Sequence, residues 1–271
     1  MGETVPYLQI RSRCAVAYSL PAEPPKYPRK ANIKKPAYSG GITSHAAKRI
    51  KKVCEILVMK SPEKVVLNPV TRKPTRFKLT FVTVTISSRT IVDHREAYEK
   101  GLKPLIRWLR TKSGVVDYIW KAELQARGQV HWHITTNTYI PWQWLRSAWN
   151  AIQKRNGWLD DYHTHFGHWN ANSIDVHAVM KVDRIELYLA KYIAKTGATI
   201  TGKVWDCSNS LAGKNYFAFV RDWDTDDAIM AAQGAGTAKA KRLDNCTIIE
   251  TRNPETLIPS QFQPDFALWK K

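Results

Sequence analysis

Hydrophobic and polar residues alternate along residues 77–86, which read Phe-Lys-Leu-Thr-Phe-Val-Thr-Val-Thr-Ile. This alternation, together with the many β-branched residues, predicts a strand with one buried face. Two strands joined by a hairpin are predicted further along, over residues 115–124 and 130–138. The same reasoning places shorter strands over residues 174–179, 203–207, 216–220 and 246–251.

Apolar residues recur at helical spacing between these strands, whereas residues 158–172, rich in His and Trp, are expected to form a loop. Strands intermixed with helices, with one hairpin, predict an α+β fold: an antiparallel β-sheet flanked by helices, rather than a parallel doubly wound sheet. The predicted helices cover residues 43–60, a segment around residues 102–109 ending near Gly114, a segment from Pro141 to Gly157, and residues 184–196 between Asp183 and Gly197.

The composition fits a globular protein, with 44% hydrophobic and 24% charged residues among 271. No run of about 18 apolar residues is present, so no membrane-spanning helix is expected. The first residues lack the apolar segment of a secretory signal. Cys14, Cys54, Cys207 and Cys246 lie far apart, which favours a reducing compartment and argues against a cysteine-based zinc site. We therefore expect a cytoplasmic protein that is not secreted.

The chain has 42 Lys and Arg against 23 Asp and Glu, a net charge of +19, which indicates a polyanionic partner such as nucleic acid. Residues 1–75 contain 15 of the basic residues and 4 of the acidic ones, an excess of +11. We expect residues 1–75 to form a basic arm and an amphipathic helix. Residues 76–221 would then form the main domain, and residues 222–271 a C-terminal extension packed on it.

One face of the helix predicted over residues 43–60 is basic. It is either a solvated surface or a contact with DNA phosphates, and the adjoining basic arm raises the weight of the second interpretation. The residues concerned are Lys48, Arg49, Lys51 and Lys52.

Two histidines lie two positions apart on the second strand of the hairpin, His131 and His133, so both imidazoles leave the same face. A three-residue loop at 126–128, with Gly128 in the left-handed conformation, would set Glu123 opposite His131. These three side chains would then converge as ligands of one metal ion, with positions left open for water and a phosphate oxygen. A two-residue loop would send Glu123 to the other face. The histidines would then have only a structural role.

A second group of chemical side chains follows helical spacing. Tyr188 and Tyr192 are one turn apart, and Lys191 and Lys195 repeat this spacing. A phenol has a pKa near 10 and needs nearby cations to attack at neutral pH. Alternatively, the two tyrosines belong to an apolar stripe that packs in the core.

Together, Phe-Val-Thr-Val-Thr at 81–85, His131-Trp-His133 and Tyr188-x-x-Lys191-Tyr192-x-x-Lys195 resemble the three motifs of HUH endonucleases. The two-tyrosine initiators of rolling-circle replication, found in circular single-stranded DNA phages and related plasmids, are the most similar subgroup. The resemblance covers residues 81–195. It implies an antiparallel sheet that carries the histidine pair, within a nuclease domain that would span residues 76–221.

The resemblance also implies the chemistry. Glu123, His131 and His133 would hold Mg or Mn, and one tyrosine would nick single-stranded DNA at an origin hairpin. The products are a 5′-phosphotyrosine and a 3′-OH that a host polymerase extends with the help of a host helicase in the bacterial cytoplasm. The second tyrosine would cut the regenerated origin. Lys191 and Lys195 would stabilise phosphate charge or lower a phenol pKa.

Other interpretations are open. The same chemistry serves HUH transposases and relaxases, and the chain could instead be a non-enzymatic basic protein that binds single-stranded nucleic acid. Contacts with DNA are expected from Arg127 in the hairpin loop and from Trp158 and Trp169, which could stack on unpaired bases. A cluster of His163, His165 and His168 is a weaker candidate for a second metal site. The segment 197–204 resembles a P-loop, but it runs from a helix into a strand and lacks the Ser or Thr after its lysine.

Overall fold

A five-stranded antiparallel sheet with the order β8-β5-β7-β6-β9 organises the middle of the chain. The computed structural model describes residues 4–11, 14–21, 40–179, 199–212, 216–219 and 225–270. The predicted strands are confirmed here, with their ends shifted. They are β5 (Leu79–Thr85), β6 (Tyr118–Leu124), β7 (Val130–Thr136), β8 (Ile174–Val179) and β9 (Trp205–Cys207).

The chain divides into two compact units, which we call the central unit (residues 38–212) and the terminal unit (residues 1–37 and 213–271). The sequence placed boundaries at 75/76 and 221/222 instead. The helix α1 (Ser44–Met59) and the two-stranded ribbon of β3 (Lys64–Leu67) and β4 (Pro74–Phe77) fall within the central unit.

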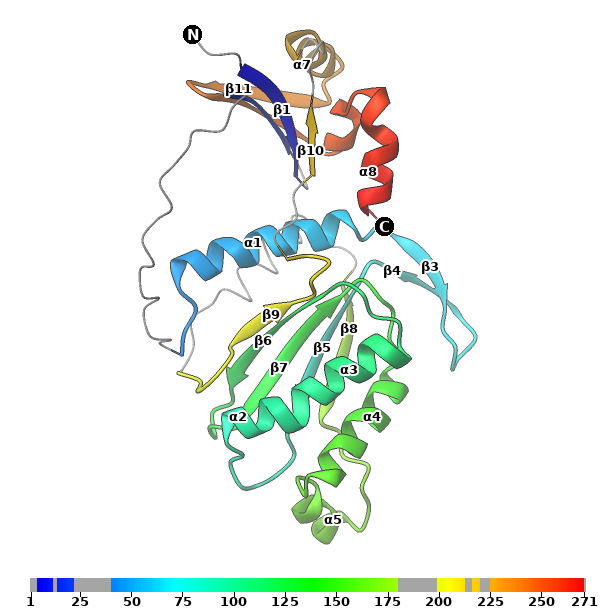
Figure 1. The fold of residues 1–271 in the computed structure, drawn as a ribbon. Coiled ribbons are helices and arrows are strands. Elements are labelled where there is room, and N and C mark those ends of the chain that lie inside the picture. Colours follow the sequence, from blue (N-terminus) through cyan, green and yellow to red (C-terminus); the bar gives the residue numbers. More distant parts are fainter. Residues whose placement is uncertain are drawn as a thin grey trace. The chain divides into compact units, whose positions relative to one another are not determined.

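Alternate residues of the central strands form the main core on one face of the sheet. Val82, Val84, Trp132 and Ile134 are buried there with residues of the helices that cover this face (Figure 1). We call it the helix face. The covering helices are α2 (His94–Glu96), the π-helical turn η1 (Ala97–Leu102), α3 (Lys103–Lys112) and α4 (Trp142–Arg155).

Close packing under these helices depends on Gly101. A Cβ built there would lie 2.9 Å from the Trp158 ring and 3.4 Å from the Trp149 ring. The loop expected over residues 158–172 is wrong in part, because α5 (Asp160–Phe166) forms within it. The Asp160 carboxylate in the first turn of α5 interacts favourably with the helix dipole, and Gly167, at φ 73°, ends the helix in the left-handed conformation.

The helix α1 begins as predicted, because the Thr43 side chain accepts a hydrogen bond from the backbone N–H of Ala46. Its apolar side, which includes Ile50, Val53 and Leu57, is buried. Just after the helix, Lys60 Nζ lies 3.2 and 3.1 Å from the two carboxylate oxygens of Asp117, and both side chains are 4% exposed.

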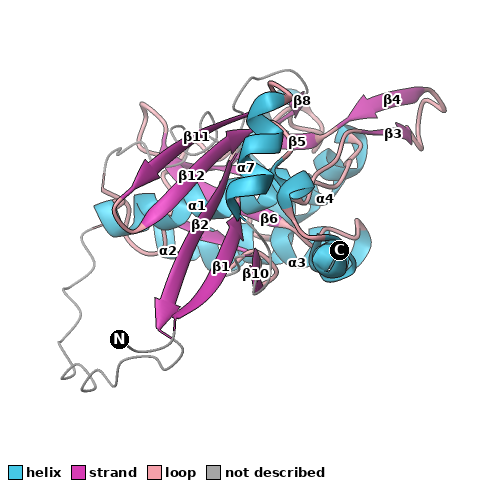
Figure 2. Cartoon of the chain, turned by 90° about the horizontal axis from the view of Figure 1, so that it is seen from above, coloured by secondary structure: helices cyan, strands magenta, loops and turns pink. Residues whose placement is uncertain are grey.

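The terminal unit joins both ends of the described chain in one antiparallel sheet of order β10-β1-β2-β12-β11, most of which is visible in Figure 2. The strands within residues 4–21 replace the first part of the expected basic arm. The Pro- and Lys-rich remainder of that arm, residues 22–36, lies outside the described residues. The elements are β1 (Thr4–Ile10), β2 (Cys14–Pro21), β10 (Tyr216–Phe219), α7 (Thr225–Gly234), β11 (Ala238–Leu243), β12 (Cys246–Thr251), η2 (Pro254–Leu257), η3 (Ser260–Phe262) and α8 (Gln263–Lys270).

The fold class is therefore α+β with antiparallel sheets flanked by helices, as predicted. None of the helices in the described parts of the chain has the length and apolar character needed to cross a bilayer.

The Lys60–Asp117 pair should be a major determinant of stability. Replacing Lys60 by Met leaves the Asp117 carboxylate buried without its cation, so we expect a loss of about 3–5 kcal/mol in the free energy of unfolding. Urea denaturation measures this loss in the free energy of unfolding. Lys103→Met is the control, because Lys103 forms an exposed pair with Glu99 and its loss should leave the midpoint nearly unchanged. Equal midpoint shifts for both variants would contradict the prediction.

Candidate metal centre

The turn between β6 and β7 has the predicted three-residue form. Gly128 adopts φ 87°, and its N–H donates to the carbonyl of Gln125 at 2.8 Å. The N–H of Gln125 donates to the carbonyl of Gln129 at 2.9 Å, which closes the hairpin. This register places Glu123 opposite His131, as the sequence predicted.

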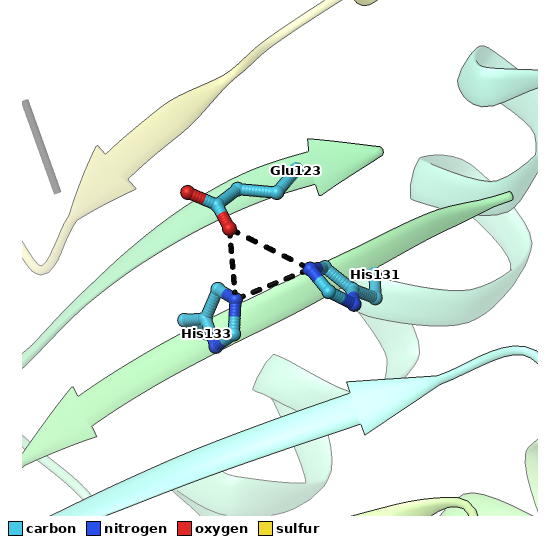
Figure 3. Close-up of side chains that lie close together, drawn as sticks. All are labelled: Glu123, His131 and His133. Carbon is cyan, nitrogen blue, oxygen red and sulfur yellow. Dashed lines mark hydrogen bonds and ion pairs between the residues drawn. The ribbon is translucent and has the colours of Figure 1, made fainter. Parts of the chain in front are cut away.

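The three predicted ligands converge on the face of the sheet that α3 and α4 do not cover, which we call the site face (Figure 3). Glu123 Oε2 lies 3.2 Å from His133 Nε2 and 3.6 Å from His131 Nε2, and the two Nε2 atoms are 3.2 Å apart. Among the described residues, this is the one group of three or more His, Cys, Asp or Glu residues whose ligand atoms lie within 4.8 Å of one another.

These separations fit one divalent ion. Two ligands at right angles around an ion with bonds of about 2.1 Å are about 3.0 Å apart, close to the three separations found. Two imidazoles and one carboxylate on one side of an ion leave its other positions open to water and to a phosphate oxygen, which is the arrangement of a catalytic rather than a structural site.

A threonine orients His133 toward the ligand cluster. Thr83, opposite His133 on β5, has its Oγ1 2.9 Å from His133 Nδ1. The Phe81 ring stacks on the imidazole with centroids 5.5 Å apart. Because Nδ1 is engaged by the hydroxyl, Nε2 is the nitrogen that faces Glu123 and His131. Such a partner fixes the ring orientation of a metal-binding histidine.

Lys121 controls which oxygen of Glu123 is offered to an ion. It lies on the site face with its side chain 3% exposed, and its Nζ is 2.6 Å from Glu123 Oε1. Oε2 alone therefore faces the histidines. The sequence analysis missed Lys121, although its spacing of two from Glu123 on a strand was a signal that both share a face.

The protonation states suit a cation. The pKa of Glu123 lies far below its usual range, because the carboxylate receives hydrogen bonds from His131, His133 and Lys121. The pKa of His133 is lowered, first because the ring is buried and then because His131 and Lys121 are close. An ionised carboxylate and a neutral imidazole are the forms that bind metals.

Asp175 and His177 share the site face, since they lie opposite Thr83 and Phe81 on the edge strand β8. Their side chains are exposed and pair with each other, with Oδ2 2.6 Å from Nε2. β5 separates them from His133, so the structure does not bring them into the ligand cluster.

The residues expected to contact DNA have diverse surroundings. The Arg127 guanidinium donates to the carbonyls of Ser88 and Ile86 at 3.1 and 2.8 Å, so it ties the hairpin turn to the end of β5. Trp158 is 5% exposed within the main core and is not a surface residue, because it fills the space above Gly101.

Trp169 is partly exposed, but its ring is already engaged. His163 stacks on it at 4.0 Å between centroids, and Lys154 Nζ lies 4.6 Å from the ring centroid. A base that stacked on the face of Trp169 covered by His163 would have to displace the imidazole. His163, His165 and His168, the weaker candidate for a metal site, do not bring their ligand atoms together in the described part of the chain.

Lys48, Arg49, Lys51 and Lys52 lie on the solvent side of α1, with Lys52 the most covered of the four. Arg49 also packs over the Trp205 ring at 5.5 Å. Tyr188, Lys191, Tyr192 and Lys195 lie outside the described residues, so their place relative to the ligand cluster stays a prediction.

An antiparallel sheet flanked by helices, with the histidine pair on the sheet, is the arrangement that the resemblance to HUH endonucleases implied. Residues 79–197 match the family model described as Replication-associated protein ORF2/G2P. The matched segment begins with β5, contains Glu123, His131 and His133, and extends beyond Tyr192. The match confirms the resemblance to rolling-circle replication initiators and supports a role in starting DNA replication. No curated protein and no solved structure matches the chain significantly.

Replacing Thr83 by Val should weaken metal binding, because the isosteric side chain removes the hydroxyl that orients His133. We expect the dissociation constant for Mn²⁺ to rise about 10- to 100-fold, measured by calorimetric titration of the metal-free protein. Thr85→Val, two residues away and opposite His131, is the matched control and should bind Mn²⁺ as the wild type does. Equal losses in the two variants would contradict a specific role for the Thr83 hydroxyl.

Proposed function

We propose that this protein is a replication initiator that nicks and rejoins single-stranded DNA at an origin through a 5′-phosphotyrosine intermediate. The observation that carries the proposal is the ligand cluster of Glu123, His131 and His133 on the site face of the sheet, within the segment that matches the replication-associated family.

The ligand cluster fits a divalent ion, Mg or Mn, which would polarise the scissile phosphate. Glu123, His131 and His133 would hold the ion, while Thr83 and Lys121 keep two of these ligands oriented. The phenol oxygen of Tyr188 or Tyr192 attacks the phosphorus after losing its proton, and the bond from phosphorus to the 3′-oxygen breaks. That oxygen takes up a proton and becomes the primer end for a host polymerase.

Rejoining reverses these steps. The free 3′-OH attacks the phosphotyrosine, the tyrosine regains its proton, and the phosphodiester reforms without a nucleotide cofactor. Two tyrosines one helical turn apart would allow a second cut while the first tyrosine still holds DNA. Lys191 and Lys195 would stabilise the phosphate charge or lower a phenol pKa.

The basic side of α1 is the proposed path of the DNA toward this centre. Arg49 contacts Trp205, and Trp205 pairs with Lys121 across β6 and β9. Directly opposite residues of antiparallel strands share a face, so Trp205 lies on the site face with Glu123. A strand bound along Lys48, Arg49, Lys51 and Lys52 would therefore run on the side of the sheet that carries the ligands.

Two other functions use the same observations. A transposase or relaxase would share the cluster and the tyrosine chemistry. A non-enzymatic protein that binds single-stranded nucleic acid would share the charge but would not need two histidines facing a glutamate. That ligand arrangement favours the enzyme.

Mixing the protein with single-stranded DNA of its own replicon and Mn²⁺ should give a covalent adduct on a denaturing gel. The adduct should disappear with EDTA, in the Tyr188→Phe/Tyr192→Phe double variant and in His133→Ala, since each removes the ion or the nucleophile. Tyr188→Phe and Tyr192→Phe, tested singly, would show which of the two phenols contributes more to the adduct.

Binding must be measured in parallel on the same DNA. DNA that binds in a salt-sensitive manner but forms no adduct with any metal would identify a binding protein and refute the proposed activity. An adduct that persists in the double tyrosine variant would refute the assignment of the nucleophile.

A further inference from the structure

Two pockets lie side by side on α3, on the helix face of the central unit. A polar pocket of about 560 Å³ lies between α3 and the turn that follows β9. An apolar pocket of about 460 Å³ lies between α3 and α4. Arg107 and Thr111 line both pockets, so the two adjoin across α3, and we call them together the groove.

Four cations surround this groove: Arg107 and Arg110 on α3, Lys112 at its end, and Arg155 on α4. All four are exposed, and none pairs with a carboxylate of the described chain. Asp206 is the one acidic residue in the walls, and Lys203 already pairs with it. The groove therefore offers unpaired positive charge to a ligand, in contrast to Lys100 and Lys103, which pair with glutamates nearby.

The two pockets differ in chemistry. The polar pocket places Thr111 and Asn209 beside Arg110, and guanidinium groups with neutral donors bind phosphate well. The apolar pocket is lined by the Trp108 ring with Ala148 and Ala151, whose small side chains leave it hollow. An indole wall within a basic rim is a surface on which unpaired bases stack.

We propose that this groove is a second binding site for single-stranded nucleic acid, with a phosphate at Arg107 and Arg110 and a base against Trp108. A nucleotide presents an anion and a flat ring next to each other, which matches the polar and apolar pockets. The carboxylates of an acidic peptide would satisfy the cations and the donors beside Arg110 but would bring no flat ring to Trp108. The site lies on the opposite face of the sheet from Glu123, so it would hold a segment other than the one being cut.

Photocrosslinking tests the site directly. A single-stranded thymidine 20-mer with 5-iodouracil is bound in EDTA, irradiated and mapped by mass spectrometry. We expect a crosslink to Trp108 in wild type that is lost in the Arg107→Ala/Arg110→Ala variant. Lys100→Ala/Lys103→Ala is the matched control, because it removes the same charge from adjoining turns outside the groove, and it should keep the crosslink. Crosslinks confined to segments of the site face would overturn the proposal.

The salt dependence of binding gives a second readout. Loss of the one phosphate held by Arg107 and Arg110 should reduce the slope of log Kd against log salt by about 0.7 for a single strand, with no change in the control. A slope equal to that of the control would overturn the proposal. The proposal would also be overturned if the Arg107→Ala/Arg110→Ala variant kept the wild-type salt slope for the oligonucleotide but no longer bound a peptide of alternating Asp and Leu.

The proposed groove site and the proposed nicking activity can be refuted independently of each other. The groove variant should still form the Mn²⁺-dependent adduct on a short oligonucleotide, because its changes are on the far face. Absence of the adduct in wild type would refute the proposed activity and leave the crosslink at Trp108 as an independent result.

Discussion

Gly128 adopts a left-handed conformation that a residue with a Cβ rarely tolerates, and the register of β6 against β7 follows from it. Side chains in a strand alternate between faces, so a slip of one residue would move Glu123 to the helix face and separate it from His131. Arg127 in the same turn fastens the hairpin to the end of β5 through backbone carbonyls. The backbone conformation of Gly128 in the turn 126–128 therefore determines whether Glu123 lies on the same face of the sheet as His131 and His133.

The polar side chains in and around the ligand cluster each contact a defined partner. Lys121 faces Glu123, and Thr83 faces His133. The strands carry the large apolar residues Trp132 and Ile134 on their other face, where the helices cover them. The alternation of β7 therefore serves two purposes, because one face supplies packing free energy while the other keeps polar groups available for chemistry.

The sequence predicted the hairpin and the three ligands because both depend on neighbouring residues: a glycine in a short loop and a spacing of two on a strand. The role of Thr83 needed the pairing of β5 with β7, which lies about fifty residues away in the chain. The helix α5 was missed because its aromatic and histidine content resembles a loop. The strands within residues 4–21 pair with each other as a local hairpin and were missed because the basic excess of residues 1–75 indicated an extended arm. Only their outer partners, such as Phe219 for Tyr7, lie near the other end of the chain.

The pairing of β1 with β10, Tyr7 opposite Phe219, has a consequence for the order of events on the ribosome. Its second strand is made more than 200 residues after the first, which takes on the order of 10 to 40 s at a synthesis rate of about 5 to 20 residues per second. The central unit is synthesised during this interval, while the outer edges of β1 and β2 lack their partners β10 and β12. The nascent N-terminal hairpin is therefore the segment that a chaperone, or a second nascent chain, has the longest opportunity to bind.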